Sequence, residues 1–107
     1  MLIQRINPAT LWPSASLTQA VRAGDTVYVS GQAPIDRNGN IVGVADVDAQ
    51  AAQIFGSLKV AVEAAGGSMS DLVKITAYLA RPEYFAAIAS ARELYLPIRD
   101  GARGSFR

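Results

Sequence analysis

Residues 26–36 read Thr-Val-Tyr-Val-Ser-Gly-Gln-Ala-Pro-Ile-Asp, and this stretch decides the fold. Its β-branched and aromatic first half predicts a strand, which runs directly into Ser30, Gly31 and Gln32. A glycine at the end of a strand lets another backbone or a small ligand approach the sheet closely. The serine hydroxyl and the glutamine amide can face that space, so we predict a binding site at the end of this strand.

Two further strands are predicted before this stretch. Residues 2–6 are apolar-rich and are followed by Asn-Pro, a pair that breaks a strand. Residues 18–22 form a weaker strand, and Ala-Gly-Asp at 23–25 makes a turn, so residues 18–32 are predicted to form a hairpin. An Asn-Gly pair at 38–39 is a strong signal for a further turn.

The second half of the chain contains two predicted helices. In residues 47–65, apolar side chains recur at three- and four-residue spacing, which is typical of a helix with one apolar face. Either Asp46 or Asp48 can cap its N-terminus, and the Gly-Gly pair at 66–67 can end it. Proline suits the first turn of the second helix, predicted over residues 82–96.

Residues 72–80, between the helices, alternate as a strand does. The residues expected to face the helices are Val73, Ile75, Ala77 and Leu79. Helices with a single apolar stripe need a sheet to cover. We therefore predict a single α+β domain over residues 1–107, with a mixed sheet and both helices packed on one of its faces. The chain leaves the other face uncovered, so an apolar surface there would be buried by another subunit.

Composition excludes several classes of site. The chain contains no Cys and no His, which excludes a thiol nucleophile, a Cys/His zinc site and a Ser-His-Asp triad. The Asp and Glu residues show no metal-ligand spacing, so we expect neither a metal nor a cofactor. Ten basic and nine acidic residues give a net charge of +1, which argues against a nucleic-acid partner. No apolar run approaches the ~20 residues that span a bilayer, and we expect a cytoplasmic protein.

The order of these motifs resembles the YjgF/RidA family over nearly the whole chain. The stretches that carry the resemblance are Gln19-Ala20, Ser30-Gly31-Gln32, residues 46–66 and residues 71–79. Members of that family are small trimeric proteins, many of them enamine/imine deaminases. The resemblance therefore implies a chorismate-mutase-like domain, a homotrimer, and binding sites at the subunit interfaces.

The resemblance also implies which residues line the substrate pocket. The matching positions are Leu17, Ser30, Gly31, Gln32 and Ala89. Two of them depart from the family pattern, because the usual pocket tyrosine is Leu17 here and a frequent asparagine is Ala89. These departures make the implied pocket more apolar.

A key arginine of the family follows the second helix and clamps the substrate carboxylate, because a planar guanidinium donates two parallel hydrogen bonds. Arg103 keeps the family's Ala-Arg pair, whereas Arg107 lies at a distance from the helix that better suits longer members. Both remain candidates, with Arg107 slightly favoured. Family members usually continue with further strands and a glutamate that positions water, and we expect that such a segment is missing here.

The implied reaction converts a 2-aminoacrylate-type enamine, through its imine, to a 2-keto acid and ammonia. Such a cofactor-independent 2-iminobutanoate/2-iminopropanoate-type deaminase needs only a held carboxylate, an oriented water and stabilised charge. One alternative is a non-catalytic trimeric protein that binds a small molecule. A weaker one is an endoribonuclease or translation inhibitor, which the absence of His as a general acid or base argues against.

Overall fold

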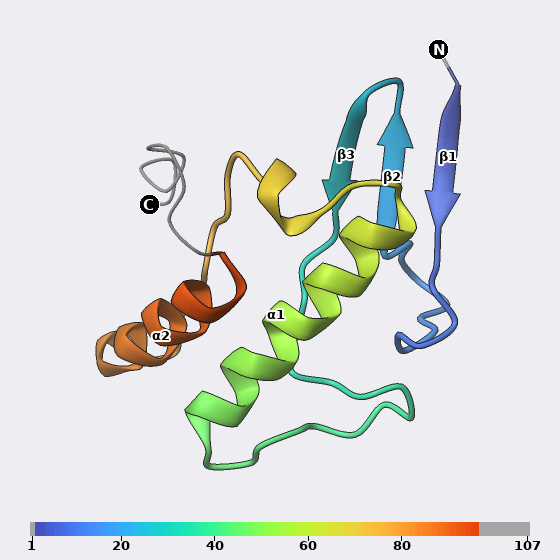
Figure 1. Ribbon diagram of the computed structural model, residues 1–107. Helices are drawn as coiled ribbons and strands as arrows, with labels where there is room; N and C mark the ends of the chain where they lie inside the picture. Colours follow the sequence, from blue (N-terminus) through green and yellow to red (C-terminus); the bar gives the residue numbers. More distant parts are fainter. Residues whose placement is uncertain (1, 97–107) are drawn as a thin grey trace.

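A three-stranded antiparallel sheet forms one side of the molecule in the computed structural model, which describes residues 2–96 (Figure 1). Its strands are β1 (Ile3–Ile6), β2 (Ala20–Ala23) and β3 (Thr26–Val29), in the order β1-β2-β3. Gly24 forms the turn of the β2–β3 hairpin with a positive φ of 61°. The predicted first strand and the predicted hairpin are confirmed.

Helix α1 (Val47–Ala64) runs across this sheet and is fixed at both ends. Of the two predicted caps, Asp46 is the N-cap, because its Oδ1 accepts a hydrogen bond of 3.1 Å from the Ala49 backbone N–H. Gly66 ends the helix with a φ of 94°. Arg22 of β2 donates from Nη1 to the Ala65 carbonyl at 3.3 Å, where a cation suits the negative end of the helix. The end of α1 is therefore joined to the sheet.

The buried side of α1 packs against two separate clusters. In the first, Ala61 and the C-cap Ala65 pack against Ile6, Leu11 and Ala20 of the sheet and its loops. In the second, Phe55 packs with Met69 and Leu96. The first helix is thus the central element of the fold.

Helix α2 (Phe85–Tyr95) packs beside α1 and away from β1 (Figure 1). Its Tyr95 ring stacks on the Phe55 ring with centroids 5.9 Å apart. The predicted arrangement, in which both helices cover one face of a mixed sheet, is wrong for the described residues. Their sheet is antiparallel, and only α1 lies along it.

Residues 72–80 form neither a strand nor a helix between the single 3₁₀ turns η1 (Met69–Asp71) and η2 (Pro82–Tyr84). The predicted strand is wrong here because a strand needs a neighbour for its backbone hydrogen bonds, and among residues 2–96 no segment pairs with this one. Val73, predicted to face the helices, is exposed, while Ile75 packs near Phe55. A groove of about 480 Å³ separates this segment from β3.

Candidate functional site

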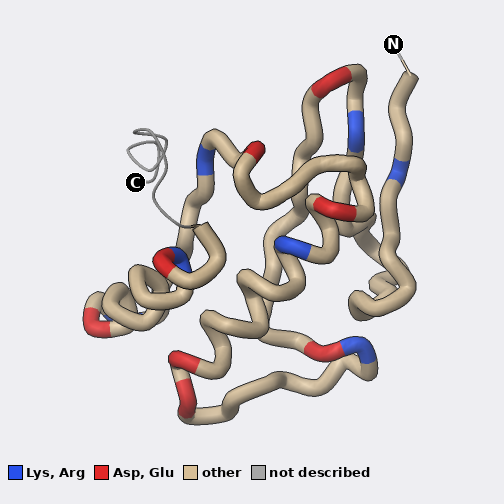
Figure 2. The backbone as a smooth tube through the Cα atoms, viewed as in Figure 1, with Lys and Arg blue, Asp and Glu red and all other residues tan. Residues whose placement is uncertain are grey.

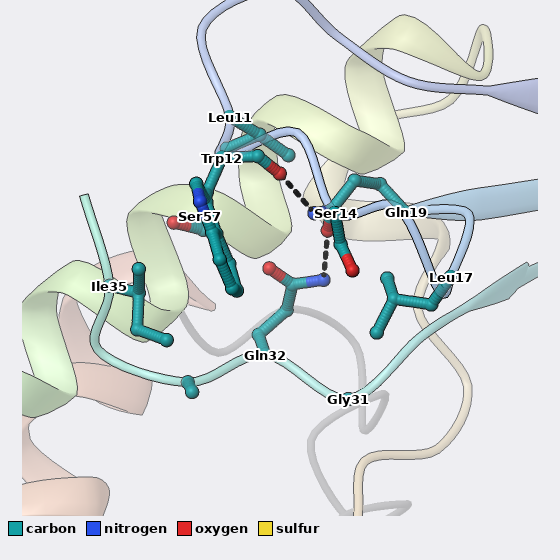
Figure 3. Close-up of a pocket in the computed structure, with 10 residues that line it drawn as sticks. Leu11, Trp12, Ser14, Leu17, Gln19, Gly31, Gln32, Ile35 and Ser57 are labelled. Carbon is teal, nitrogen blue, oxygen red and sulfur yellow. Dashed lines mark hydrogen bonds between the residues drawn. The ribbon is translucent and has the colours of Figure 1, made fainter. Parts of the chain in front are cut away.

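The Ser-Gly-Gln sequence that follows β3 lies at a small pocket of about 120 Å³ (Figure 3). The loop between β1 and β2 forms the opposite wall, and Ser57 of α1 reaches the pocket from the helix. Among residues 2–96, none of the side chains that line the pocket is ionisable. The residues that line the pocket are Leu11, Trp12, Ser14, Leu17, Gln19, Gly31, Gln32, Ala33, Ile35 and Ser57.

Gln19 holds the two walls of the pocket together. Its Nε2 donates to the Trp12 carbonyl at 3.0 Å, and its Oε1 accepts from Gln32 Nε2 at 2.9 Å. Its backbone N–H donates to Asn7 Oδ1 at 3.0 Å. Because the Gln19 side chain is buried, these hydrogen bonds fix its position.

The same network sets the orientation of the Gln32 amide. Gln32 Nε2 donates to Gln19 Oε1 and also to the Ser30 carbonyl at 3.1 Å. An amide nitrogen carries two hydrogens, and a flipped amide would place oxygen against both acceptors. The Gln32 Oε1 therefore remains as an acceptor, and it is turned toward the side of the pocket where Trp12 lies (Figure 3).

Ser30 connects the end of β3 to the opposite loop. Its backbone N–H donates to the Gln19 carbonyl at 3.0 Å, and its hydroxyl donates to the Thr18 carbonyl. Its side chain is thus engaged with the loop backbone and does not line the pocket.

The structure brings together three of the predicted binding residues, Leu17, Gly31 and Gln32, in one pocket. Ala89 lies on α2 and is not among the lining residues. Arg103 and Arg107 lie outside the described residues. The roles of all these residues in binding or catalysis remain predictions.

The sequence did not predict the other seven lining residues, among them Trp12, Gln19 and Ser57. Ser57 precedes the buried Ala61 by one helical turn. Small residues recur at positions 57, 61 and 65, and this row could have indicated that Ser57 lies on the buried side of the helix. Trp12 is a lone aromatic residue in a loop, which is weaker evidence that a residue lines a pocket.

Replacing Gly31 with alanine should leave the fold intact. A Cβ built at Gly31 meets no atom within 4 Å, and its φ lies outside the left-handed region. We expect the melting temperature of Gly31→Ala to stay within about 4 °C of the wild type, which corresponds to less than about 1 kcal/mol. Thermal unfolding followed by circular dichroism checks this. A larger loss would show that the fold itself requires glycine here.

The described residues contain neither a metal cluster nor a membrane span. Among residues 2–96, no three acidic, His or Cys side chains gather where they could hold a metal ion. The helices in the same part of the chain lack the combined length and apolarity that a bilayer crossing requires.

Comparisons with known proteins relate this chain to a group of small proteins. The family model described as Endoribonuclease L-PSP matches residues 8–102. A RutC family protein of Pyrococcus horikoshii is 39% identical over 75 residues, which are 69% of this chain and 59% of that protein. A 2-iminobutanoate/2-iminopropanoate deaminase of Dermatophagoides farinae is 36% identical over 81 residues, which are 76% of this chain and 63% of that protein. The matches thus span less than two thirds of either relative.

The fold is also similar to solved structures. The crystal structure of RidA from the Antarctic bacterium Psychrobacter sp. superposes with a TM-score of 0.80 at 34% identity. The superposition covers 87% of this chain and 76% of that one.

Proposed function

Because the chain belongs to the Endoribonuclease L-PSP family, which includes the YjgF, RidA and RutC proteins, we propose that it is a deaminase of reactive enamines and imines. Its products would be a 2-keto acid and ammonia. The observation that carries this proposal is the 36% identity, over 76% of this chain, to a protein named 2-iminobutanoate/2-iminopropanoate deaminase.

In the proposed reaction, the enamine takes up a proton on carbon and loses one from nitrogen, which gives the imine. Water adds to the imine carbon, a proton moves to nitrogen, and ammonia leaves as the carbonyl forms. The protein has to hold the substrate and orient the water, and this requires no strong nucleophile. Gln32 Oε1 is a fixed acceptor beside the space that a substrate would occupy, and Gly31 permits close approach of the substrate to the backbone.

The carboxylate of the substrate requires a cation, and none of the described residues that line this pocket is charged. We assign this role to Arg103 or Arg107, of which one would form the two parallel hydrogen bonds. The Arg–carboxylate pair would then hold one end of the substrate, while the pocket would hold the other.

We further propose a homotrimer with its sites at subunit interfaces. The strand register places Arg5, Val21 and Tyr28 side by side on the sheet face opposite Ala20. Tyr28 is exposed and Val21 is half-buried on that face, while α1 covers the other one. An uncovered face with apolar members suits burial against further copies of the chain.

The test is the release of ammonia and keto acid from freshly generated 2-aminoacrylate and 2-iminobutanoate by the full-length protein. We expect either Arg103→Ala or Arg107→Ala to lower kcat/KM by about tenfold or more, the loss that accompanies removal of a charged hydrogen bond. Arg81→Ala is the matched control, because Arg81 is exposed and, among the described residues, its ion pair is a 3.9 Å contact with Glu83. Equal activity of all three variants would contradict the assignment of the carboxylate anchor.

A second candidate function is the binding of a small molecule without catalysis. Leu17 favours it, since an aliphatic side chain stands in the pocket where the family resemblance leads one to expect a hydroxyl. A folded trimer that releases no ammonia from either substrate would support this candidate over the deaminase. RNA cleavage gains no support from the described residues, whose Lys and Arg are spread over strands, loops and both helices (Figure 2).

A further inference from the structure

The exposed turn between Ile35 and Ile41 contains the pair Asn38-Gly39 and lies against a wall of the pocket. We propose that Asn38 is a site of covalent modification, at which the side-chain amide is lost through a cyclic imide, and that this change alters the wall that Trp12 forms. The proposal goes beyond the deaminase assignment and does not depend on it.

The reaction joins two groups that are neighbours in the chain. The Gly39 backbone nitrogen attacks the side-chain carbonyl carbon of Asn38 and loses its proton, and the amide nitrogen leaves as ammonia. Water then opens the five-membered imide at either carbonyl carbon. One opening gives aspartate, and the other gives isoaspartate, in which the main chain runs through the β-carbon. Overall, one water is consumed and one ammonia is released, so no oxidant or other reactant is required.

The sequence and the exposure of the turn favour this reaction at Asn38. A side chain on the following residue would obstruct the attack, and Gly39 has none. Asn38 is exposed, and among residues 2–96 its side-chain amide makes no hydrogen bond that would hold it away from the backbone. The amide is therefore able to reach the Gly39 nitrogen.

Asp36 holds the turn closed and sets the rate. Its carbonyl accepts from the Gly39 N–H at 3.0 Å, and its Oδ1 accepts from the backbone N–H groups of Asn38 at 2.9 Å and Asn40 at 3.0 Å. The Gly39 nitrogen has to leave its hydrogen bond before it can attack. We therefore expect the folded protein to react about fivefold more slowly than the urea-unfolded chain, the factor that corresponds to one net hydrogen bond.

The other two asparagines of the sequence lack this combination. Asn7 precedes Pro8, which has no N–H to lose, and Asn7 Oδ1 accepts from the Gln19 backbone N–H at 3.0 Å. Asn40 precedes Ile41, whose β-branched side chain crowds the attacking nitrogen. Asn38 is thus the asparagine that should react first.

Gly39 contacts the Trp12 ring, so a change of the backbone there reaches the pocket. A Cβ built on Gly39 would lie 3.1 Å from Trp12 Nε1, 3.5 Å from Cε2 and 3.7 Å from Cδ1. The same indole lines the pocket. Isoaspartate adds one methylene group to the main chain directly before Gly39, which moves residue 39 relative to the ring. Both products also add a negative charge close to the Asp36 carboxylate, and the repulsion loosens the turn.

The first measurement locates the modification. We would incubate the full-length protein at mildly alkaline pH, which favours loss of the Gly39 N–H proton, and identify the altered residue by mass spectrometry of its peptides. Asn38 should convert to a mixture of isoaspartate and aspartate before Asn40 changes. One added negative charge lowers the net charge of +1 to zero, so ion-exchange chromatography separates the modified protein.

The second measurement follows the pocket wall through tryptophan fluorescence, since Trp12 is the one tryptophan of the sequence. The separated isoaspartate form should emit at longer wavelength and be quenched more strongly by acrylamide, because the indole loses its contact with residue 39. Asn38→Gln is the matched control. It keeps an exposed amide, but its longer side chain cannot close a five-membered ring, so its charge and fluorescence should stay constant over the same incubation.

Three results would overturn the proposal. The first is an Asn38 that stays intact over the incubation or reacts after Asn40, and the second is an isoaspartate form whose Trp12 emission and quenching match those of fresh protein. The third is an equal fluorescence change in incubated Asn38→Gln, which would have another cause. Ammonia release from 2-iminobutanoate, measured on fresh protein, tests the proposed function separately.

Discussion

Phe55→Ala should lower the free energy of unfolding by about 3–5 kcal/mol, the usual cost of removing a buried aromatic side chain. Phe55 is only 3% exposed and packs in one cluster with Met69 and Leu96. Its ring also stacks on Tyr95 with an interplanar angle of 20°. The substitution therefore opens a cavity between α1 and α2 and removes the contact that joins them.

Urea unfolding at one fixed protein concentration measures this loss, since the apparent stability of an oligomer depends on concentration. Phe85→Ala is the matched control, because Phe85 begins α2 with 58% of its surface exposed. It should cost about 1 kcal/mol or less. If Phe55→Ala destabilised the protein no more than Phe85→Ala does, the cluster around Phe55 would not be part of the core in solution.

Gly43→Ala should destabilise the protein by about 3 kcal/mol. Gly43 has a φ of 69°, a conformation that costs an L-residue about 1–2 kcal/mol. A Cβ there would lie 2.9 Å from Ala49 Cβ and 2.9 Å from the Asp46 carbonyl oxygen. These atoms belong to the start of α1 and its N-cap, so they cannot move away easily, and overpacking adds about 1–3 kcal/mol.

Gly24→Ala separates the two contributions. Gly24 has a similar φ of 61°, but a Cβ there meets no atom within 4 Å. It should cost only the conformational part, about 1–2 kcal/mol. Calorimetry of both variants measures the difference. Equal melting temperatures would show that the contact of residue 43 with the N-terminus of α1 is not tight in solution.

The elements that the sequence predicts well are those with local causes. The β2–β3 hairpin follows from β-branched residues on either side of a glycine turn, and α1 follows from an N-cap and a terminal glycine. Residues 72–80 show the limit of such signals. Their alternation favours a strand, but whether a strand forms depends on a neighbour elsewhere in space, which alternation cannot reveal.

The candidate site also contains residues that local sequence patterns predict and residues that they do not predict. Gly31 and Gln32 were predicted because their motif ends a strand, and both line the pocket. Ser57 was not predicted, since an apolar stripe does not reveal that a polar residue beside it is buried as well. Trp12 reaches the pocket because of the path of an irregular loop, and no periodic pattern in the sequence predicts that path.

The two clusters that α1 packs against also bear on how rigidly the pocket is held. A helix that contributes to two clusters can open only when both break, so its amides should exchange with solvent at rates set by global unfolding. Both walls of the pocket rest on this helix, through Leu11 on one side and through Gln53, whose Nε2 donates to the Ile35 carbonyl at 3.2 Å, on the other. The two walls should therefore keep their separation as long as the protein is folded. A ligand would then find the pocket already formed.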